Sequence, residues 1–142
     1  MMGYDEHFAG GEAGSVSSIN YVKNGIAGML ENVPREKLIG GVPFYTRLWT
    51  EAGDGTITSK AMGIAEEKRW VDNNQVELTW QADTAQYYGE VQTSDGAQFL
   101  WMEEERSLKE KMNVIRQNDL AGVACWKLGF EDSAAWDSIQ WN

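Results

Sequence analysis

The sequence predicts an α/β fold in which parallel strands alternate with helices and a smaller α+β segment interrupts them. Three apolar runs, at residues 1–4, 38–44 and 120–128, end in aromatic and charged side chains. Such runs are typical of buried parallel strands whose carboxyl ends open onto a ligand site. Between residues 49 and 103 the apolar residues instead recur with a period of two, which indicates antiparallel strands. Two kinds of sheet are therefore expected in one chain.

The first element pair is a strand at residues 1–4 and a helix after the glycine-rich loop 8–14. Ser17 or Ser18 can cap this helix, and its apolar positions follow the 3.6-residue period: Ile19, Val22, Ile26, Met29, Leu30 and Val33. Pro34 lies just past its end. The strand at 38–44 follows, and this strand, helix, strand order is the parallel unit of an α/β fold.

The middle segment predicts a helix of about a dozen residues that starts at Thr58 or Ser59 and then three antiparallel strands. Met62, Ala65 and Trp70 share one side of the expected helix. The expected strands cover residues 76–80, 86–91 and 97–102. Ser94-Asp95-Gly96 supplies a tight turn between the last two of them.

The last segment begins with Glu103-Glu104-Glu105, which we interpret as a helix start rather than a catalytic cluster. Negative charge is favourable in the first turn of a helix, where backbone N–H groups are exposed. The helix is expected to end near Asn118, followed by the strand at 120–128 and a tail with one or two helical turns.

These elements divide the chain into three segments. We expect strands and a helix of the parallel sheet in residues 1–49, the α+β insertion in residues 50–103, and the remaining parallel elements with a C-terminal helix in residues 104–142.

Composition excludes some functions. The chain has 142 residues, 12 basic against 22 acidic side chains and a formal charge of −10, which argues against nucleic acid as a partner. No stretch approaches the roughly 20 apolar residues of a membrane helix, so no membrane insertion is expected. Cys125 is the only cysteine, and its apolar surroundings favour a small buried hydrophobic residue over a reactive thiol.

Three motifs stand at the expected strand ends: Met2-Gly3-Tyr4-Asp5, Gly41-Val42-Pro43-Phe44-Tyr45-Thr46-Arg47, and Gly122-Val123-Ala124-Cys125-Trp126-Lys127-Leu128. In this order they resemble the sixth, seventh and eighth barrel strands of family-18 glycoside hydrolases, the chitinase-like enzymes. Tyr4-Asp5-Glu6-His7 resembles the spore-germination and peptidoglycan-hydrolysing branch. The resemblance implies the C-terminal fragment of a (β/α)8 TIM barrel, with the insertion between strand seven and helix seven.

The resemblance also implies roles for individual residues. Tyr4 would hold the acetamido group of an N-acetylglucosamine unit and Asp5 would hydrogen-bond the same sugar, so that the acetamido oxygen attacks the anomeric carbon. Trp126 would form the floor under that sugar. The implied substrate-binding residues also include Met2, Glu6, His7, Tyr45 and Arg47, while Thr46, where many relatives have glycine, would narrow the cleft. The Asp-x-x-Asp-x-Asp-x-Glu run that carries the general acid in this family does not occur here, so we expect the isolated chain to be inactive.

Each of these residues also has a purely structural interpretation. Asp5 could cap a loop, Tyr4 and Trp126 could belong to the core, and Arg47 could form a salt bridge. His7 is the only histidine, and its neighbours lack the spacing of a metal site, so neither a metal nor a cofactor is expected.

Two other functions stay open. The chain could be a non-catalytic glycan-binding or spore-coat interaction module, or an ordinary α/β domain with an accidental resemblance. As partners we expect a glycan that contains N-acetylglucosamine, and either a second copy bound through exposed strand edges or the N-terminal part of a barrel. The cell envelope, the spore and the extracellular space are the locations that the resemblance implies.

Overall fold

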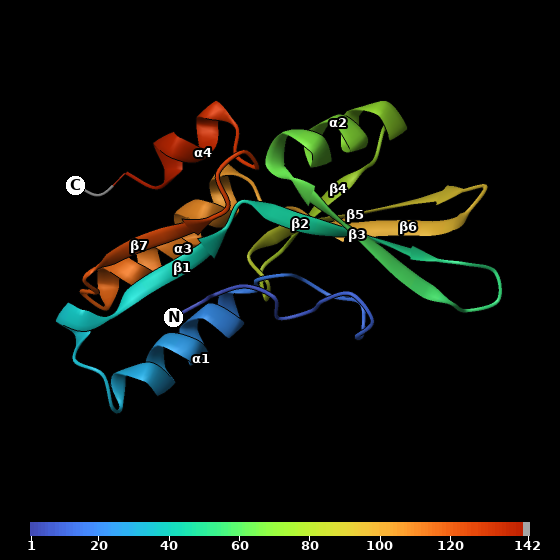
Figure 1. Ribbon diagram of the computed structural model, residues 1–142. Coiled ribbons are helices and arrows are strands. Elements are labelled where there is room, and N and C mark those ends of the chain that lie inside the picture. Colours follow the sequence, from blue (N-terminus) through green and yellow to red (C-terminus); the bar gives the residue numbers. More distant parts are fainter. Residues whose placement is uncertain (141–142) are drawn as a thin grey trace.

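The computed structural model describes residues 1–140. They form two regions that lie end to end, each a sheet with its own helices, and we call these regions the parallel layer and the antiparallel layer (Figure 1). The parallel layer holds β1 (Ile39–Pro43) and β7 (Gly122–Trp126) with α1 (Ile19–Leu30), α3 (Glu105–Gln117) and α4 (Ser133–Ser138). The antiparallel layer holds a five-stranded sheet, β2 to β6, covered by α2 (Ile64–Asn74). Both kinds of sheet that the sequence predicts are thus present.

In the parallel layer, β1 lies between β7 and the start of the chain. The strand predicted at residues 1–4 is reduced to a single bridge at Met2. Gly41 pairs with Ala124 of β7 on one side and bridges Met2 on the other, both in parallel. The Gly41 backbone N–H donates to the Met1 carbonyl at 2.8 Å, and the Gly3 N–H donates to the Gly41 carbonyl at 3.1 Å. A Cβ at Gly41 would lie only 2.8 Å from the Met1 carbonyl oxygen, so this close approach requires glycine.

The helices of this layer begin at the caps that their sequences provide. The Ser18 hydroxyl accepts from the Tyr21 N–H at 3.1 Å at the start of α1. At the start of α3, Glu104 and Ser107 form a reciprocal capping box. A short 3-10 turn, Arg35–Lys37, leads from α1 into β1.

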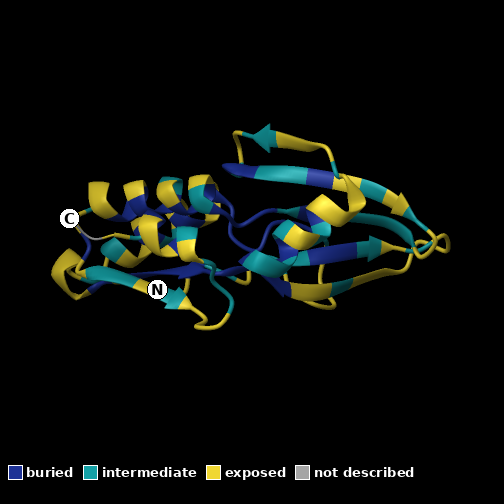
Figure 2. Cartoon of the chain, turned by 90° about the horizontal axis from the view of Figure 1, so that it is seen from above, coloured by how far each residue is buried: buried dark blue, intermediate teal, exposed yellow. Residues whose placement is uncertain are grey.

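The core of the parallel layer lies between its sheet and its helices, and only one face of the sheet is covered. Val42, Phe44, Leu108, Met112 and Ile115 are among its fully buried members. Figure 2 shows buried residues on the helix sides that face the sheet and exposed residues on the opposite sides. The uncovered face and its margins carry exposed apolar side chains: Met2, Ile39, Trp126 and Leu128.

The antiparallel layer has the strand order β3-β2-β6-β5-β4. Its strands are β2 (Tyr45–Glu51), β3 (Ile57–Gly63), β4 (Leu78–Gln81), β5 (Gln86–Thr93) and β6 (Gly96–Trp101). Its core is smaller than the first and lies between α2 and the sheet: Leu48, Met62, Val71, Leu100 and Met102. The turn at residues 94–96 joins β5 to β6, as its sequence predicts.

The predicted helix start at Thr58 or Ser59 is wrong, because residues 57–63 form β3 and the helix begins only at Ile64. All seven residues of β3 pair with β2, from Tyr45↔Gly63 to Glu51↔Ile57. The side chains of Met62 and Trp70 pack in the same core, but they come from a strand and a helix. Because Met62 and Trp70 are both apolar residues of this core, their spacing in the sequence resembled that of residues on one face of a single helix.

A buried polar cluster joins the two layers, and we call it the seam cluster: Glu67, Gln86, Glu103, Ser107 and Lys111. The Lys111 ammonium donates to both Glu103 carboxylate oxygens, at 2.9 and 3.0 Å, and both side chains are fully buried. The Gln86 amide donates to Glu103 at 3.2 Å. Glu104 and Glu105 do start α3 as expected, but Glu103 serves as the buried partner of a lysine.

Within residues 1–140 no helix is long and apolar enough to cross a bilayer.

Candidate functional site

Four of the residues singled out in the sequence lie together at the carboxyl ends of the parallel strands, and we call them the strand-end cluster: Tyr4, Asp5, Tyr45 and Trp126. The rings of Tyr4 and Trp126 stack with centroids 6.4 Å apart and an interplanar angle of 22°. The Tyr45 ring meets Tyr4 edge to face, with centroids 6.3 Å apart. The Tyr45 hydroxyl donates a hydrogen bond to the Asp5 carboxylate.

The backbone explains how neighbouring residues Tyr4 and Asp5 reach the same cluster. In a regular strand their side chains would point to opposite faces. Asp5 instead adopts φ +60°, the left-handed region that aspartate tolerates better than most residues, so the chain turns at Asp5 and is not extended there. Tyr4 lies over Gly41, where a Cβ would approach its ring to 3.3 Å.

Both phenols of the cluster keep their protons at neutral pH. Burial raises the pKa of Tyr45 far above its ordinary value, and the hydrogen bond to Asp5 and the charge of that carboxylate add to the rise. The positive charge of Arg47 acts in the opposite direction on the same pKa. Burial and Asp5 also raise the pKa of Tyr4. The cluster therefore offers stacked rings, a carboxylate acceptor and phenolic donors, which suits recognition of a sugar that bears an amide.

Arg47 lies beside this cluster on β2, two residues after Tyr45 and on the same side of the strand. Its Nη1 donates to the Ser59 hydroxyl at 3.0 Å, and its buried Nε has no hydrogen-bond partner among residues 1–140. The salt bridge that we considered for Arg47 is not formed within this part of the chain.

Two further residues border the cluster, and the sequence analysis did not select them. The ring of Phe130 lies 6.3 Å from that of Tyr45. The ammonium of Lys127 lies 4.6 Å from the centroid of the Phe130 ring. Their only signal in the sequence is that Lys127 follows Trp126 directly and Phe130 lies four residues after it, where a strand that ends at a site continues into a loop.

Glu6 and His7 do not join the strand-end cluster. The Glu6 carboxylate accepts from the Ser18 N–H at 2.7 Å and from its hydroxyl at 3.0 Å, so it caps α1. His7 Nδ1 lies 2.8 Å from the Ser15 carbonyl oxygen. Both residues line a different hollow of about 410 Å³, which lies between the loop that precedes α1 and the end of β4. Met2 makes the isolated bridge to Gly41, two residues before Tyr4, and is 73% exposed.

Thr46 does not narrow the cleft as expected. It is buried, and its hydroxyl donates to the Trp101 carbonyl, which ties β2 to β6. Because side chains alternate along a strand, Thr46 points away from the face that carries Tyr45 and Arg47.

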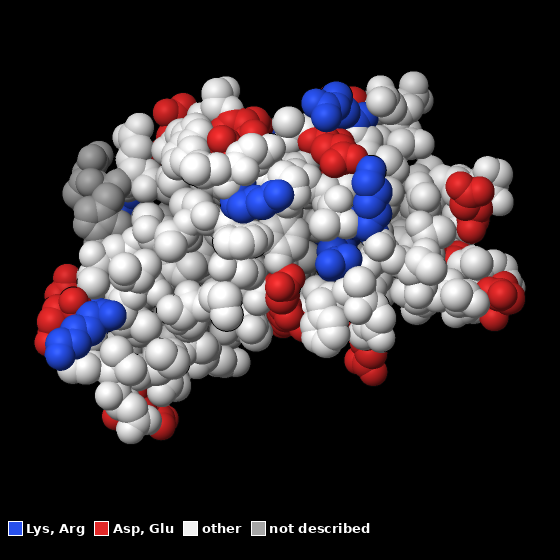
Figure 3. Space-filling model, viewed as in Figure 1, with Lys and Arg blue, Asp and Glu red and all other residues white. Residues whose placement is uncertain are grey.

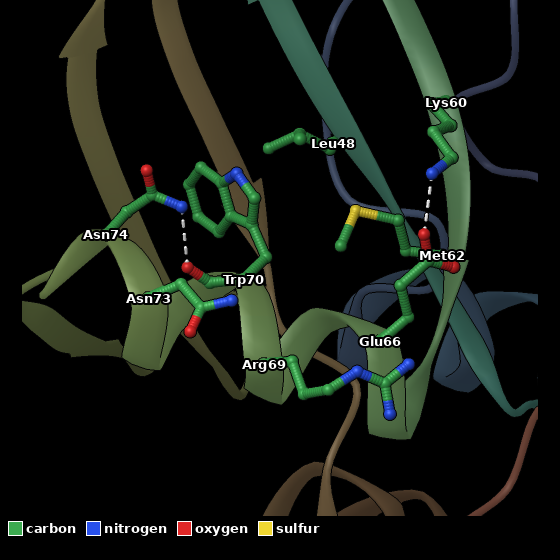
Figure 4. Close-up of a pocket in the computed structure, with 8 residues that line it drawn as sticks. All are labelled: Leu48, Lys60, Met62, Glu66, Arg69, Trp70, Asn73 and Asn74. Carbon is green, nitrogen blue, oxygen red and sulfur yellow. Dashed lines mark hydrogen bonds and ion pairs between the residues drawn. The ribbon is translucent and has the colours of Figure 1, made fainter.

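Another hollow, of about 360 Å³, lies on the far side of β2 between β3 and α2 (Figure 4). Trp70 and Leu48 form apolar walls, and the Lys60–Glu66 ion pair closes one side. Leu48 alternates with Arg47 along β2, so this hollow is separated from the strand-end cluster by the strand itself.

Cys125 is half-buried, and burial followed by the charge of Glu131 raises the pKa of its thiol to about 11. It is therefore a protonated thiol at neutral pH. Among residues 1–140 no group of three or more His, Cys, Asp or Glu side chains could hold a metal ion.

Residues 1–131 match the model of the glycosyl hydrolases family 18. The uncharacterized glycosylase YvbX of Bacillus subtilis (strain 168) is 28% identical over 141 residues, which are 99% of this chain and 40% of that protein. The cortical fragment-lytic enzyme of the same organism is 26% identical over 138 residues, 96% of this chain and 32% of the enzyme. The chain thus spans roughly a third to two fifths of the length of these relatives.

Solved structures share the fold. A chitinase from Chromobacterium violaceum superimposes with a TM-score of 0.88 at 22% identity, over 97% of this chain and 43% of the chitinase chain. The spore cortex-lytic enzyme SleL of Bacillus megaterium gives a TM-score of 0.85 at 24% identity, over 97% of this chain and 32% of SleL. The α/β fold of this chain is therefore a chitinase-like fold that corresponds to part of those larger chains.

Proposed function

The chain belongs to family 18 of the glycosyl hydrolases, and we propose that its strand-end cluster binds the N-acetylglucosamine unit beside a β-1,4 bond that is to be cleaved. The family and the cortex-lytic and chitinase relatives establish a glycoside hydrolase character. The substrate that we propose is peptidoglycan, with chitin as the second choice. Peptidoglycan is favoured because the relatives include cortical fragment-lytic enzymes.

One observation carries this proposal, namely that Tyr4, Asp5, Tyr45 and Trp126 meet although they come from three distant segments of the chain. A scattered arrangement would have left the motif resemblance without a common ligand. An exposed indole is a platform for the apolar face of a pyranose ring, and Trp126 is 54% exposed.

We propose substrate-assisted, retaining hydrolysis as the reaction. The acetamido carbonyl oxygen of the bound sugar bonds to the anomeric carbon while the glycosidic C–O bond breaks. The leaving oxygen takes a proton from a general acid, and water then opens the cyclic intermediate with retention of configuration. Tyr4 and Asp5 would hold the acetamido group in position for attack, a contribution of the kind that proximity makes to catalysis.

The general acid of this reaction is the part that the chain does not supply. The acidic Asp-x-x-Asp-x-Asp-x-Glu run is absent from the 142 residues, so we propose that the chain alone binds the glycan without cleaving it. This also leaves a non-catalytic glycan-binding module as the second candidate function. Assay of reducing sugar released from chitooligosaccharides and cell-wall glycan tests both, and robust turnover would contradict them.

Binding of a chitin pentasaccharide, followed by calorimetry, tests the strand-end cluster directly. Trp126→Ala removes the platform and is expected to weaken binding by about tenfold or more, because stacking on an aromatic ring contributes about 1–3 kcal/mol. Trp70→Ala, in the separate hollow behind β2, is the matched control and should leave the affinity unchanged. Equal affinities of the wild type and Trp126→Ala would reject the proposed site.

We further propose that residues 1–4, β1 and β7 correspond to barrel strands six, seven and eight, with residues 50–103 as an insertion between segments 1–49 and 104–142. The uncovered sheet face and the open strand edges support association, either with a second copy or with the N-terminal part of a barrel. Analytical ultracentrifugation of the chain should show a dimer or larger assembly. A monodisperse monomer would argue against self-association.

A further inference from the structure

We propose that Arg47 and Lys127 make the strand-end cluster selective for glycans whose substituents carry carboxylates, over neutral glycans with the same sugar backbone. This inference rests on the proposed function, since it concerns the ligand of the same site. To the binding role that the resemblance implies for Arg47 it adds a preference for carboxylates, and it adds Lys127, to which the resemblance assigns no role.

Arg47 brings an uncompensated positive charge to the border of the cluster. Its guanidinium forms no ion pair within residues 1–140, and its only polar partner there is the neutral Ser59 hydroxyl. The group is half-buried, so solvent screens its charge less than that of an exposed side chain. A planar guanidinium also matches the two oxygens of a carboxylate better than it matches a single hydroxyl.

Lys127 brings a second cation to the neighbourhood of Tyr45. Its ammonium lies 4.6 Å from the centroid of the Phe130 ring, and that ring lies 6.3 Å from the ring of Tyr45. Lys127 is exposed, follows the platform residue Trp126 directly and has no ion pair within the described residues. A substituent that projects from a sugar stacked on Trp126 would meet this ammonium.

The rest of the molecule makes these two cations unusual. The chain has a net charge of −10, and on the face shown in Figure 3 acidic side chains are spread widely, with basic ones among them over β2, β3 and α2. Two acids lie near the site: Asp5 is engaged by Tyr45, and Glu131 accepts from the Gly129 N–H at 2.7 Å. More distant carboxylates contribute little, because charges are screened over about 8 Å at physiological ionic strength.

Three oligosaccharides with one backbone test the proposal by calorimetry on the chain itself. The first is a neutral N-acetylglucosamine oligomer, the second an oligomer of alternating N-acetylglucosamine and N-acetylmuramic acid with free lactyl carboxylates, and the third the same oligomer with those carboxylates converted to amides. We expect the carboxylate form to bind about five- to tenfold more tightly than its amide at 50 mM salt, and the difference to shrink at 300 mM salt.

The variants localise the effect. Lys127→Gln should lower the preference for carboxylate over amide about twofold, and Arg47→Gln about three- to fivefold, with circular dichroism as the check on folding. Lys37→Gln removes the same charge at the amino end of β1, away from the cluster, and should leave the preference unchanged.

The possible failures are distinct. Equal, salt-independent binding of carboxylate and amide forms, with loss of both in Trp126→Ala, would overturn the charge selectivity and leave the proposed glycan site standing. If neither form binds the folded chain, both proposals are rejected. A preference that persists in Lys127→Gln and Arg47→Gln would place the selectivity elsewhere and overturn this assignment.

Discussion

The parallel and antiparallel layers differ in how completely the faces of their strands are covered. The sheet of the parallel layer is covered by α1 and α3 on one face, while its other face exposes Trp126 and Met2. The β2 strand of the antiparallel layer is covered by α2 on one side, and on its other side Trp49 is buried, with its indole N–H donating to the Gly14 carbonyl at 2.9 Å. The first layer leaves a surface for a ligand or partner, and the second closes over its own strand.

The candidate site lies at the boundary between the two layers. The parallel layer contributes the stacked rings of Tyr4 and Trp126, and the antiparallel layer contributes Tyr45 and Arg47. Neither layer holds the full cluster, so the packing between them decides the site geometry.

The largest effect is expected at the seam cluster that fixes this packing. Lys111→Met would leave the Glu103 carboxylate buried without its counter-charge, which costs about 3–5 kcal/mol of unfolding free energy. Urea unfolding measures this loss. Lys68→Met, which removes a half-exposed lysine from ion pairs with Glu105 and Asp132, is the control and should cost about 1 kcal/mol or less. Similar losses in both variants would show that the seam cluster does not hold the layers together.

Two tryptophans contrast the layers directly. Trp49→Ala should destabilise the chain by about 3–5 kcal/mol, because it opens a cavity and removes the bond to Gly14. Trp126→Ala should change stability by only about 0.5 kcal/mol, because the indole is 54% exposed. Thermal unfolding of both variants tests this. A large loss in Trp126→Ala would mean that the open face is covered in solution.

A pH dependence is expected from Glu67 of α2. Burial raises the pKa of its carboxyl group well above the ordinary value, and the charges of Glu103 and Glu104 add to this, so the folded state holds the proton. The contribution of Glu67 to the free energy of unfolding is then complete below the pKa that this carboxyl group has in the unfolded chain. It declines by about 1.4 kcal/mol per pH unit as the pH rises from there toward the pKa of Glu67 in the folded chain. Urea unfolding between pH 5 and 8 should show a smaller decline in Glu67→Gln. Identical slopes would contradict a buried, protonated Glu67.

The smallest effect is expected on the surface of the antiparallel layer. Lys60→Met breaks an exposed ion pair with Glu66, whose contribution is about 0.5 kcal/mol. Unfolding at low and high salt measures it. A loss above about 1 kcal/mol would show that α2 depends on this pair to dock on β3.

A helix or turn could be predicted from the sequence where its residues alone produced a recognisable local pattern. The apolar period of α1 and the Ser94–Gly96 turn are examples, and both are present. The strand β3 was missed because its buried Met62 aligns by chance with the apolar face of α2.

Most contacts between residues far apart in the sequence could not be predicted from local sequence patterns. Glu103 stands in an acidic run that predicts a helix start, and only the fold shows that Lys111, Gln86 and Ser107 surround it. The meeting of Tyr4 with Trp126 was expected from motif resemblance, whereas the position of Lys127 over Phe130 depends on the loop after β7.

The step from Pro43 to Tyr45 has a consequence for how this architecture tolerates length changes. β1 ends at Pro43 and β2 begins at Tyr45, so one continuous stretch of chain serves both sheets. A residue gained or lost in the exposed β2–β3 turn alters only its length. One residue inserted after Phe44 would reverse the alternation of β2, turning the phenol and the guanidinium toward α2 and Leu48 toward the side that now carries the strand-end cluster.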